Sequence, residues 1–259
     1  MRLRGRVVAI TGGASGLGAA LAVGAHDRGA AAVAVLDLDT EGARSVAQRV
    51  GGLGVTADVA DPDSFGHALR TVGDALGPVD VFIANAGVMR RSTVHAPDAE
   101  WDLAWRVHVL SVAWAAQELT RTGRPVHLGV TASTAAVAPN PKSAVYSVTK
   151  HAQLALAEWL GAAYRGRGLS VTCFCPGGIR TPMLAAMAAD DPYTRAARAE
   201  ADPPEVAAAA FLDGIESDRA LATTKPRTRE EIALRGADYE AWLHRAAGRF
   251  ADSPSPLEN

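Results

Sequence analysis

The stretch VVAITGGASGLG, residues 7–18, decides the fold of this chain. A short apolar and β-branched run, Val7–Thr11, leads into a turn in which Gly12, Gly16 and Gly18 recur, and small apolar residues follow. Glycines let backbone N–H groups approach a phosphate, and the N-terminus of the next helix adds partial positive charge. This order predicts the first βα unit of a nucleotide-binding α/β domain, although a glycine-rich turn alone is weak evidence for a cofactor.

The same alternation of short apolar runs and longer alanine-rich segments continues along the chain. Strands that alternate with helices indicate βαβ units and a parallel sheet covered on both faces. We therefore predict an α/β fold, a Rossmann-type doubly wound parallel sheet of about seven strands flanked by helices. The expected strands are Val7–Thr11, Ala32–Leu36, Leu53–Ala57, Val79–Ala84, Val126–Thr131, Val171–Phe174 and, at the edge, Ala220–Thr223, and the expected helices are 16–28, 40–50, 62–76, 98–121 and 143–166.

The chain is expected to form one domain over residues 1–259, because no proline- or serine-rich linker interrupts its first 175 residues. The stretch 182–202 is rich in alanine and charge, and we expect it to form a substrate lid. Residues 226–249 are expected to add a polar helical extension at the C-terminus.

The overall composition argues for a soluble protein without a polyanionic partner. Of 259 residues, 48% are hydrophobic and 21% charged, and the net charge is only −2, which gives no sign of nucleic-acid binding. The apolar run in MRLRGRVVAITGG is too short for a signal peptide or a membrane span. We expect a cytoplasmic protein that acts on a small molecule and has no membrane partner.

The cysteines and histidines point to neither a disulfide nor a metal. Cys173 and Cys175 lie two apart in a strand-like run, where a disulfide would be strained, so two buried thiols are expected. The seven histidines are scattered and lack the spacing of zinc ligands, so no metal is expected.

The motif VAVLDLD places Asp37 about twenty residues past the glycine turn, after the second expected strand. A carboxylate at this point can accept hydrogen bonds from the adenosine ribose and would repel a 2′-phosphate, which favours NAD over NADP. The alternative is that Asp37 only caps the next helix, but Asp39 is better placed for that role.

The motif YSVTK, residues 146–150, would place Tyr146 and Lys150 one turn apart on the same face of a helix. A phenol beside an ammonium can arise by chance on any helix surface. The pair gains meaning only from the other motifs, which are the glycine turn, Asp37, ADV at 57–59, NAG at 85–87, Ser133 in TASTAA and PGGIRTPM at 176–183.

In this order and spacing, the motifs resemble those of the short-chain dehydrogenase/reductase family over roughly residues 5–220. The resemblance implies that Tyr146 is the general acid/base, that Lys150 lowers its pKa and binds the nicotinamide ribose, and that Ser133 holds the substrate oxygen. It also implies cofactor contacts from Gly12, Ser15, Gly16, Leu17, Gly18, Asp37, Leu38, Asp58, Val59, Asn85, Ala86, Gly87, Tyr146, Lys150, Pro176, Gly177, Ile179 and Thr181.

One position departs from the family pattern. The stretch WDLAWRVHVL carries His108 where the family usually has an asparagine that supports a water next to Lys150. A neutral histidine also has one donor and one acceptor, but it can titrate near pH 6.5. His108 is therefore either a tolerated substitute with a rearranged water or part of a damaged or altered proton relay.

These observations predict an NAD-dependent oxidoreductase that interconverts a secondary alcohol and a ketone. The alternatives are a cofactor-bound protein with little redox activity, which His108 alone favours, and a non-redox reaction on the same scaffold. The family resemblance and the alanine-rich helices 98–121 and 143–166 favour a homo-oligomer, a tetramer or a dimer.

The substrate pocket is expected to be apolar and to draw on residues 90–96, 134–144 and 178–200. Arginines 90, 91 and 180 could meet an acidic group or simply face solvent. The sequence gives neither the substrate nor the direction of the reaction. The apolar side chains expected there are Ala135, Ala136, Val137, Met183, Leu184 and Met187.

Overall fold

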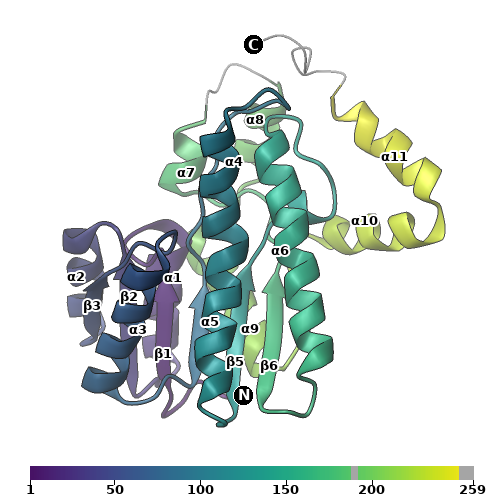
Figure 1. Cartoon of the computed structure of the whole chain (residues 1–259). Helices are drawn as coiled ribbons and strands as arrows, with labels where there is room; N and C mark the ends of the chain where they lie inside the picture. Colours follow the sequence, from purple (N-terminus) through teal and green to yellow (C-terminus); the bar gives the residue numbers. More distant parts are fainter. Residues whose placement is uncertain (188–191, 251–259) are drawn as a thin grey trace.

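The computed structural model describes residues 1–187 and 192–250. Its centre is one sheet of seven parallel strands in the order β3-β2-β1-β4-β5-β6-β7 (Figure 1). The expected α/β doubly wound fold is confirmed, and so is a short seventh strand at the edge. The strands are β1 (Val7–Thr11), β2 (Ala32–Asp37), β3 (Leu53–Thr56), β4 (Val81–Ala84), β5 (Val126–Thr131), β6 (Leu169–Phe174) and β7 (Leu221–Ala222).

Helices cover both faces of the sheet (Figure 1). One buried cluster joins the sheet to α3, α5 and α6, and a second joins its other face to α1, α2 and α9. The helices are α1 (Gly16–Asp27), α2 (Thr40–Arg49), α3 (Pro62–Leu76), α4 (Asp98–Trp105), α5 (Ser111–Arg121), α6 (Ala144–Ala163), α7 (Pro182–Ala185), α8 (Pro192–Ala199), α9 (Pro204–Glu216), α10 (Pro226–Ala237) and α11 (Tyr239–Gly248).

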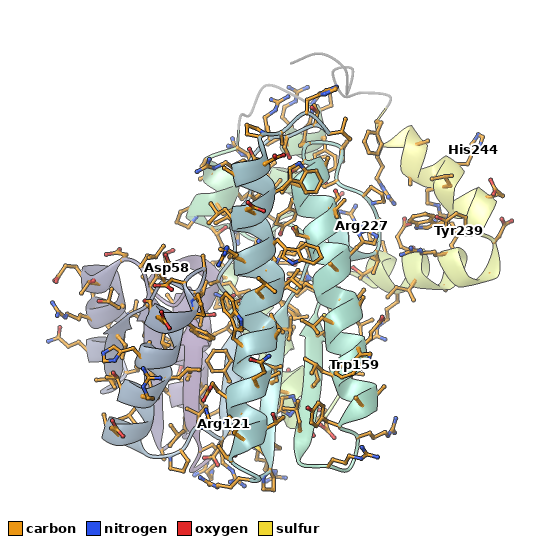
Figure 2. All side chains as sticks on the ribbon, in the orientation of Figure 1. Asp58, Arg121, Trp159, Arg227, Tyr239 and His244 are labelled. Carbon is orange, nitrogen blue, oxygen red and sulfur yellow. The ribbon has the colours of Figure 1, made fainter. Side chains whose placement is uncertain are left out.

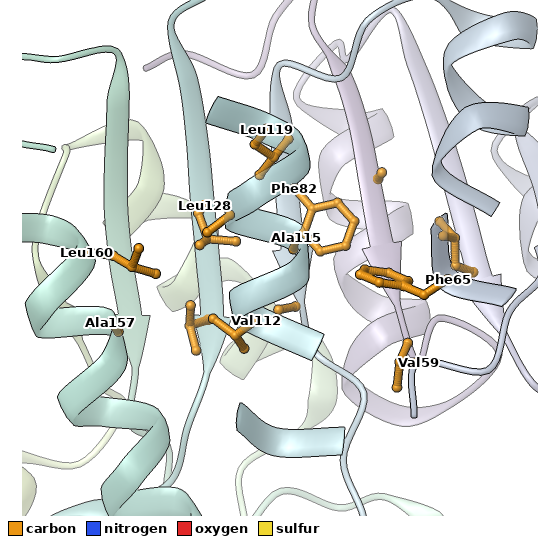
Figure 3. Packing of buried hydrophobic residues seen from close by; sticks show 14 of the residues in the cluster. Val59, Phe65, Phe82, Val112, Ala115, Leu119, Leu128, Ala157 and Leu160 are labelled. Atoms are coloured by element: carbon orange, nitrogen blue, oxygen red, sulfur yellow. The ribbon is translucent and has the colours of Figure 1, made fainter. Parts of the chain in front are cut away.

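The first buried cluster packs large and small side chains from the strands against those of the helices. Figure 3 shows Phe65 of α3 and Phe82 of β4, whose rings meet edge to face with centroids 5.9 Å apart. Beside them, Ala115 of α5 and Ala157 of α6 let both helices pack closely on the sheet. This packing fixes α6, which carries Tyr146 and Lys150, relative to the carboxyl ends of β4 and β5.

The strand order changes direction between β1 and β4. At such a point the connections leave β1 and β4 toward opposite faces of the sheet, so a crevice opens at their carboxyl ends. The glycine turn, Asp37 and the NAG segment at 85–87 each lie at or just after the end of β1, β2 or β4. The topology therefore gathers the motifs that the sequence singled out.

Two helical predictions were too simple. The expected helix 98–121 is divided by a π-helical segment, Arg106–Leu110, because its hydrogen bonds widen by one residue per turn there. The expected extension 226–249 is two helices that meet at Asp238. The Asp238 backbone is extended, and its carboxylate caps α11 by accepting from the N–H of Ala241 at 2.9 Å.

The predicted lid at 182–202 is only partly described. It contains α7 and α8, while residues 188–191 lie outside the described residues. At its end, Ile179 pairs with Asp202, and the Asp202 carboxylate forms an ion pair with the Lys225 ammonium at 2.9 Å. Lid motion stays a prediction.

The described residues form neither a membrane-spanning helix nor a cluster of metal-binding side chains. No helix in the described ranges is long and apolar enough to cross a membrane. Within the same ranges, no three His, Cys, Asp or Glu side chains gather as they would around a metal ion, and both cysteines are free and buried.

Candidate active site

The glycine positions of the turn between β1 and α1 have no room for side chains. Gly12 and Gly16 adopt left-handed backbone angles, with φ of 63° and 51°. A Cβ on Gly18 would lie 2.0 Å from the backbone oxygen of Gly12, so only glycine allows α1 to begin this close to β1. The turn therefore presents bare backbone to the crevice, as a pyrophosphate site requires.

The NAG segment after β4 is fastened to this turn. Asn85 donates from Nδ2 to the backbone oxygens of Thr11 (3.0 Å) and Gly12 (3.2 Å). Its Oδ1 accepts a hydrogen bond from the Thr131 hydroxyl at 3.2 Å. One side chain thus links the ends of β1, β4 and β5, which fixes the floor of the crevice.

Asp37 stands at the end of β2 and faces the glycine turn. Its Oδ2 accepts from the N–H of Ala14 at 2.9 Å and its Oδ1 from the N–H of Asp39 at 3.0 Å. Asp39, not Asp37, caps α2 by accepting from the N–H of Gly42 at 3.0 Å. The capping role is therefore already filled, and the Asp37 carboxylate is held by two backbone N–H groups beside the glycine turn.

Ser133 and Tyr146 meet at the carboxyl end of β5. Ser133 begins the short 3₁₀ turn Thr134–Ala136, and Tyr146 lies in the first turn of α6, which Ser143 caps. Burial raises the pKa of Tyr146 to about 12, and a side-chain hydrogen bond with Ser133 acts in the opposite direction. The hydroxyl of Ser133 thus lies close enough to the phenol to act on its pKa.

Lys150 lies one helical turn beyond Tyr146, with its Nζ 5.6 Å from the centre of the phenol ring. The Nζ donates to the backbone oxygen of Thr131 and to Oε1 of Gln153, both at 2.8 Å. Burial lowers the pKa of Lys150 to about 7. With this pKa, Lys150 is largely uncharged at the pH where the Tyr146 phenol ionises. This explains why Lys150 does not lower the pKa of Tyr146 in the protein alone, as the family resemblance had implied.

His108 lies behind the crevice rather than in its wall. Its Nε2 accepts from the backbone N–H of Val88 at 3.1 Å, and its Nδ1 lies 2.8 Å from the Thr149 hydroxyl. That hydroxyl already donates to the Val145 oxygen at 2.8 Å, so it accepts from Nδ1–H, which fixes the tautomer. Burial, and then the charge of Lys150, lower the pKa of His108 well below 6.5. The neutral ring of His108 thus links the 85–88 segment to α6 by two hydrogen bonds.

A cavity of about 520 Å³ joins these parts. Every cofactor contact implied by the sequence lies in its wall, from the glycine turn to Thr181, together with Ser133, Tyr146 and Lys150. The glycine cradle and the Asp37 carboxylate fit a dinucleotide with free ribose hydroxyls. Sequence reasoning missed several further lining residues, whose apolar types give no signal of their own: Val88, Met89, Leu103 and Val107.

Some of the residues expected in the substrate pocket line the cavity and others do not. Met183, Leu184 and Met187 line it, and so do Thr134 and Asn140 from the expected range 134–144. Ala135, Ala136 and Val137 are buried behind its wall, because the 3₁₀ turn points them inward. Arginines 90, 91 and 180 are exposed and do not line the cavity.

A family model described as short chain dehydrogenase matches residues 6–192. The chain belongs to the short chain dehydrogenase family. Its similarity to a short chain dehydrogenase/reductase from Burkholderia phymatum in complex with NAD is in the fold, with a TM-score of 0.83, 22% identity and coverage of 93% of this chain and 96% of the other.

Two further proteins resemble this short chain dehydrogenase. The 1-deoxy-11-beta-hydroxypentalenate dehydrogenase of Streptomyces exfoliatus is 36% identical over 204 residues, 73% of each chain. A short chain dehydrogenase from Burkholderia cenocepacia in complex with NADP has a TM-score of 0.75 and 28% identity, with coverage of 86% of this chain and 96% of the other. Structural relatives thus bind either nicotinamide cofactor.

We predict that His108 does not titrate during turnover. Because its pKa lies well below 6.5, the pH–rate profile of the wild type should show no inflection that belongs to His108. His108→Asn still offers an acceptor to Val88 and should keep the profile. His108→Leu leaves that buried N–H unpaired and should lower the rate about tenfold with cofactor affinity largely kept.

The measurement is the pH–rate profile of the three proteins on any accepted alcohol. An inflection near pH 6.5 that disappears in His108→Asn would make the ring a proton carrier instead. Three indistinguishable profiles would show that His108 has no part in the reaction.

Proposed function

We propose that this protein is an NAD-dependent oxidoreductase that interconverts a secondary alcohol and a ketone, with Tyr146 as the general acid/base. The observation that carries the proposal is one cavity lined by the glycine turn, Asp37, Ser133, Tyr146 and Lys150. Membership of the short chain dehydrogenase family and a dehydrogenase relative support it.

The roles follow from position and charge. The bound nicotinamide supplies the carbon that takes or gives the hydride, and in its oxidised form it adds a positive charge. In oxidation, Ser133 holds the alcohol oxygen by its hydroxyl, and tyrosinate at Tyr146 takes the proton from that oxygen as the hydride leaves the carbinol carbon. In reduction, the Tyr146 hydroxyl returns the proton. General acid/base catalysis of this kind contributes about 10²–10⁴-fold, the loss expected for Tyr146→Phe.

The pKa of Tyr146 sets the pH dependence of both directions. Its value is raised to about 12, so tyrosinate is scarce at neutral pH unless positive charge stands nearby. Oxidation needs tyrosinate and should speed up as pH rises, whereas reduction needs the phenol and should be favoured at lower pH.

The alternative is a cofactor-bound protein with weak or no redox activity, or one that runs a non-redox reaction. The exchange of the usual asparagine for His108 favours it, while the intact set of Ser133, Tyr146 and Lys150 favours the dehydrogenase. Formation of NADH, followed by absorbance over a panel of secondary alcohols, separates the two. No NADH from any alcohol, with NAD bound, would support the alternative.

The choice of NAD over NADP rests on Asp37. Its carboxylate is held by two backbone N–H groups, and the next residue is Leu38, which is 67% exposed and carries no charge to meet a 2′-phosphate. The glycine turn, GGASGLG, also lacks a basic residue. A phosphate on the adenosine ribose would therefore meet a fixed negative charge.

We predict that NAD binds more tightly than NADP. Asp37→Ala should reduce the difference in affinity between the two cofactors, chiefly by removing the repulsion of the 2′-phosphate. Calorimetric titration of both cofactors into both proteins measures this. Asp63→Ala is the matched control, since it removes a carboxylate that lies outside the cavity wall and should leave the ratio unchanged. Tighter binding of NADP to the wild type would overturn the assignment.

The substrate end of the cavity selects an uncharged, apolar alcohol. Asp37, Asp58 and Lys150 are the only charged side chains in the wall formed by the described residues, and the two carboxylates lie at the cofactor end. The segments 188–191 and 251–259 contain no Lys, Arg or His. Lys150 is directed at the cofactor and Tyr146, so a substrate carboxylate would lose water and meet no other cationic side chain in the described wall, which is costly. The relative from Streptomyces exfoliatus, by contrast, is named for a hydroxylated carboxylate.

We predict that a neutral alicyclic alcohol is preferred over its carboxylate counterpart. For cis-4-methylcyclohexanol against cis-4-hydroxycyclohexanecarboxylate, kcat/KM should favour the neutral compound by about tenfold or more, because the anion is desolvated without a partner. Leu184→Lys, which puts an ammonium in the wall, should narrow that ratio. Equal or better turnover of the carboxylate by the wild type would contradict the assignment.

We also propose a cytoplasmic homo-oligomer, a tetramer or a dimer. Trp159 is 63% exposed and Val148 49% exposed on the outer face of α6, where Figure 2 shows the Trp159 side chain. Large apolar side chains exposed on one helix face favour burial against another copy. The free thiols of Cys173 and Cys175 are in keeping with a reducing compartment.

We predict that Trp159→Glu shifts the assembly toward smaller species, because it would bury a charge without a partner. Light scattering at micromolar concentration measures the mass, and Trp159→Phe is the control that should keep the assembly. A wild-type monomer at this concentration would rule the proposal out.

A further inference from the structure

Gln153 is an amide in a place where an apolar side chain would suit the fold. It lies on the buried face of α6, three residues after Lys150, and is 1% exposed. The next residues on this face, Ala157 and Leu160, belong to the cluster packed on the sheet. An amide among such neighbours is costly unless it is hydrogen-bonded, so its partner explains its presence.

That partner is the lysine of the active site. Oε1 of Gln153 accepts from Lys150 Nζ at 2.8 Å, and the Thr131 backbone oxygen accepts from the same Nζ at 2.8 Å. An ammonium has three N–H donors. Two of these N–H groups donate to acceptors on β5 and α6. The third can point into the cavity, because Lys150 is one of the residues that line it.

The groups that face Lys150 include no carboxylate partner. No ion pair joins Lys150 to a carboxylate within residues 1–187 and 192–250. His108 faces it from the π-helical segment and Tyr146 from α6, and Cys173 and Cys175 act on it from β6 and just beyond. His108 is held neutral, and its Nε2 is already engaged by Val88. The fixed acceptors of the ammonium are therefore two neutral oxygens.

We propose that Gln153 is a positioning residue for the hydride-transfer reaction, and that its amide oxygen keeps the Lys150 ammonium charged and directed at the cofactor and Tyr146. The role in catalysis rests on the proposed function, but the effect on Lys150 does not. The Thr131 acceptor is a backbone oxygen, which a substitution does not remove. Of the two acceptors, the amide oxygen of Gln153 is therefore the one that a side chain provides. Since burial brings the pKa of Lys150 to about 7, the loss of one acceptor would be enough to change the charge of the lysine at neutral pH.

The composition of the chain allows a direct test. It contains three lysines, Lys142, Lys150 and Lys225, so a protein labelled with ¹³C at lysine Cε gives three signals. Lys142→Arg and Lys225→Arg assign the remaining signal to Lys150. The titration of that signal by NMR reports the pKa of Lys150 without any turnover.

Gln153→Met keeps the length and volume of the side chain but removes the amide oxygen. It should move the Lys150 titration down by about one pH unit, the effect of losing a hydrogen bond to a charged group. Gln153→Glu keeps an acceptor and adds a negative charge, so it should move the titration up. Gln117→Met, on the exposed face of α5, is the matched control and should move nothing.

Kinetics complete the test. In Gln153→Met, the acidic limb of kcat/KM for alcohol oxidation should move to higher pH, with a loss of about tenfold at pH 7. A shifted titration without NADH formation in the wild type would refute the proposed function and leave the effect on Lys150 intact. If Gln153→Met does not fold, Gln153→Glu still decides. An unmoved Lys150 signal in the folded variants would overturn the proposal.

Discussion

Burial of the Lys150 amino group between β5 and α6 is the constraint on which the rest of the site depends. An ammonium taken out of water must find acceptors, and here they are a strand carbonyl and an amide on its own helix. The same burial raises the pKa of Tyr146 and lowers that of Lys150. Burial thus disfavours the charged form of both side chains. Small changes in charge in the crevice therefore decide which of the two is ionised.

The fold supplies the other half of the site by topology alone. Reversal of the strand order between β1 and β4 opens the crevice, and Gly12, Gly16 and Gly18 keep side chains out of the closest part of the turn. Asn85 ties three strand ends together, so the position of the cofactor site relative to Ser133 is fixed by hydrogen bonds rather than by loop packing.

Elements with strong local signals could be predicted from the sequence. The strands are short β-branched runs, and the glycine turn, Asp37 and YSVTK stand at fixed points relative to them. The π-helical segment at 106–110 could not be predicted, since its residues suit an ordinary helix and only packing selects the wider turn. The break at Asp238 did leave a sign, a capping residue inside a helical stretch. Gln153 is likewise visible in the sequence as a polar residue among the apolar residues of one helix face. Its hydrogen bond to Lys150 could be identified only from the structure.

The account holds that the carbinol hydrogen of the substrate passes to the nicotinamide while Tyr146 takes the hydroxyl proton. A secondary alcohol carrying deuterium on its carbinol carbon tests this most directly, with NAD and the purified protein and with mass spectrometry of the recovered cofactor. The account predicts NADH that carries one deuterium, and a slower transfer by about 10²–10⁴-fold in Tyr146→Phe. Alcohol consumed without deuterium in the cofactor would contradict it.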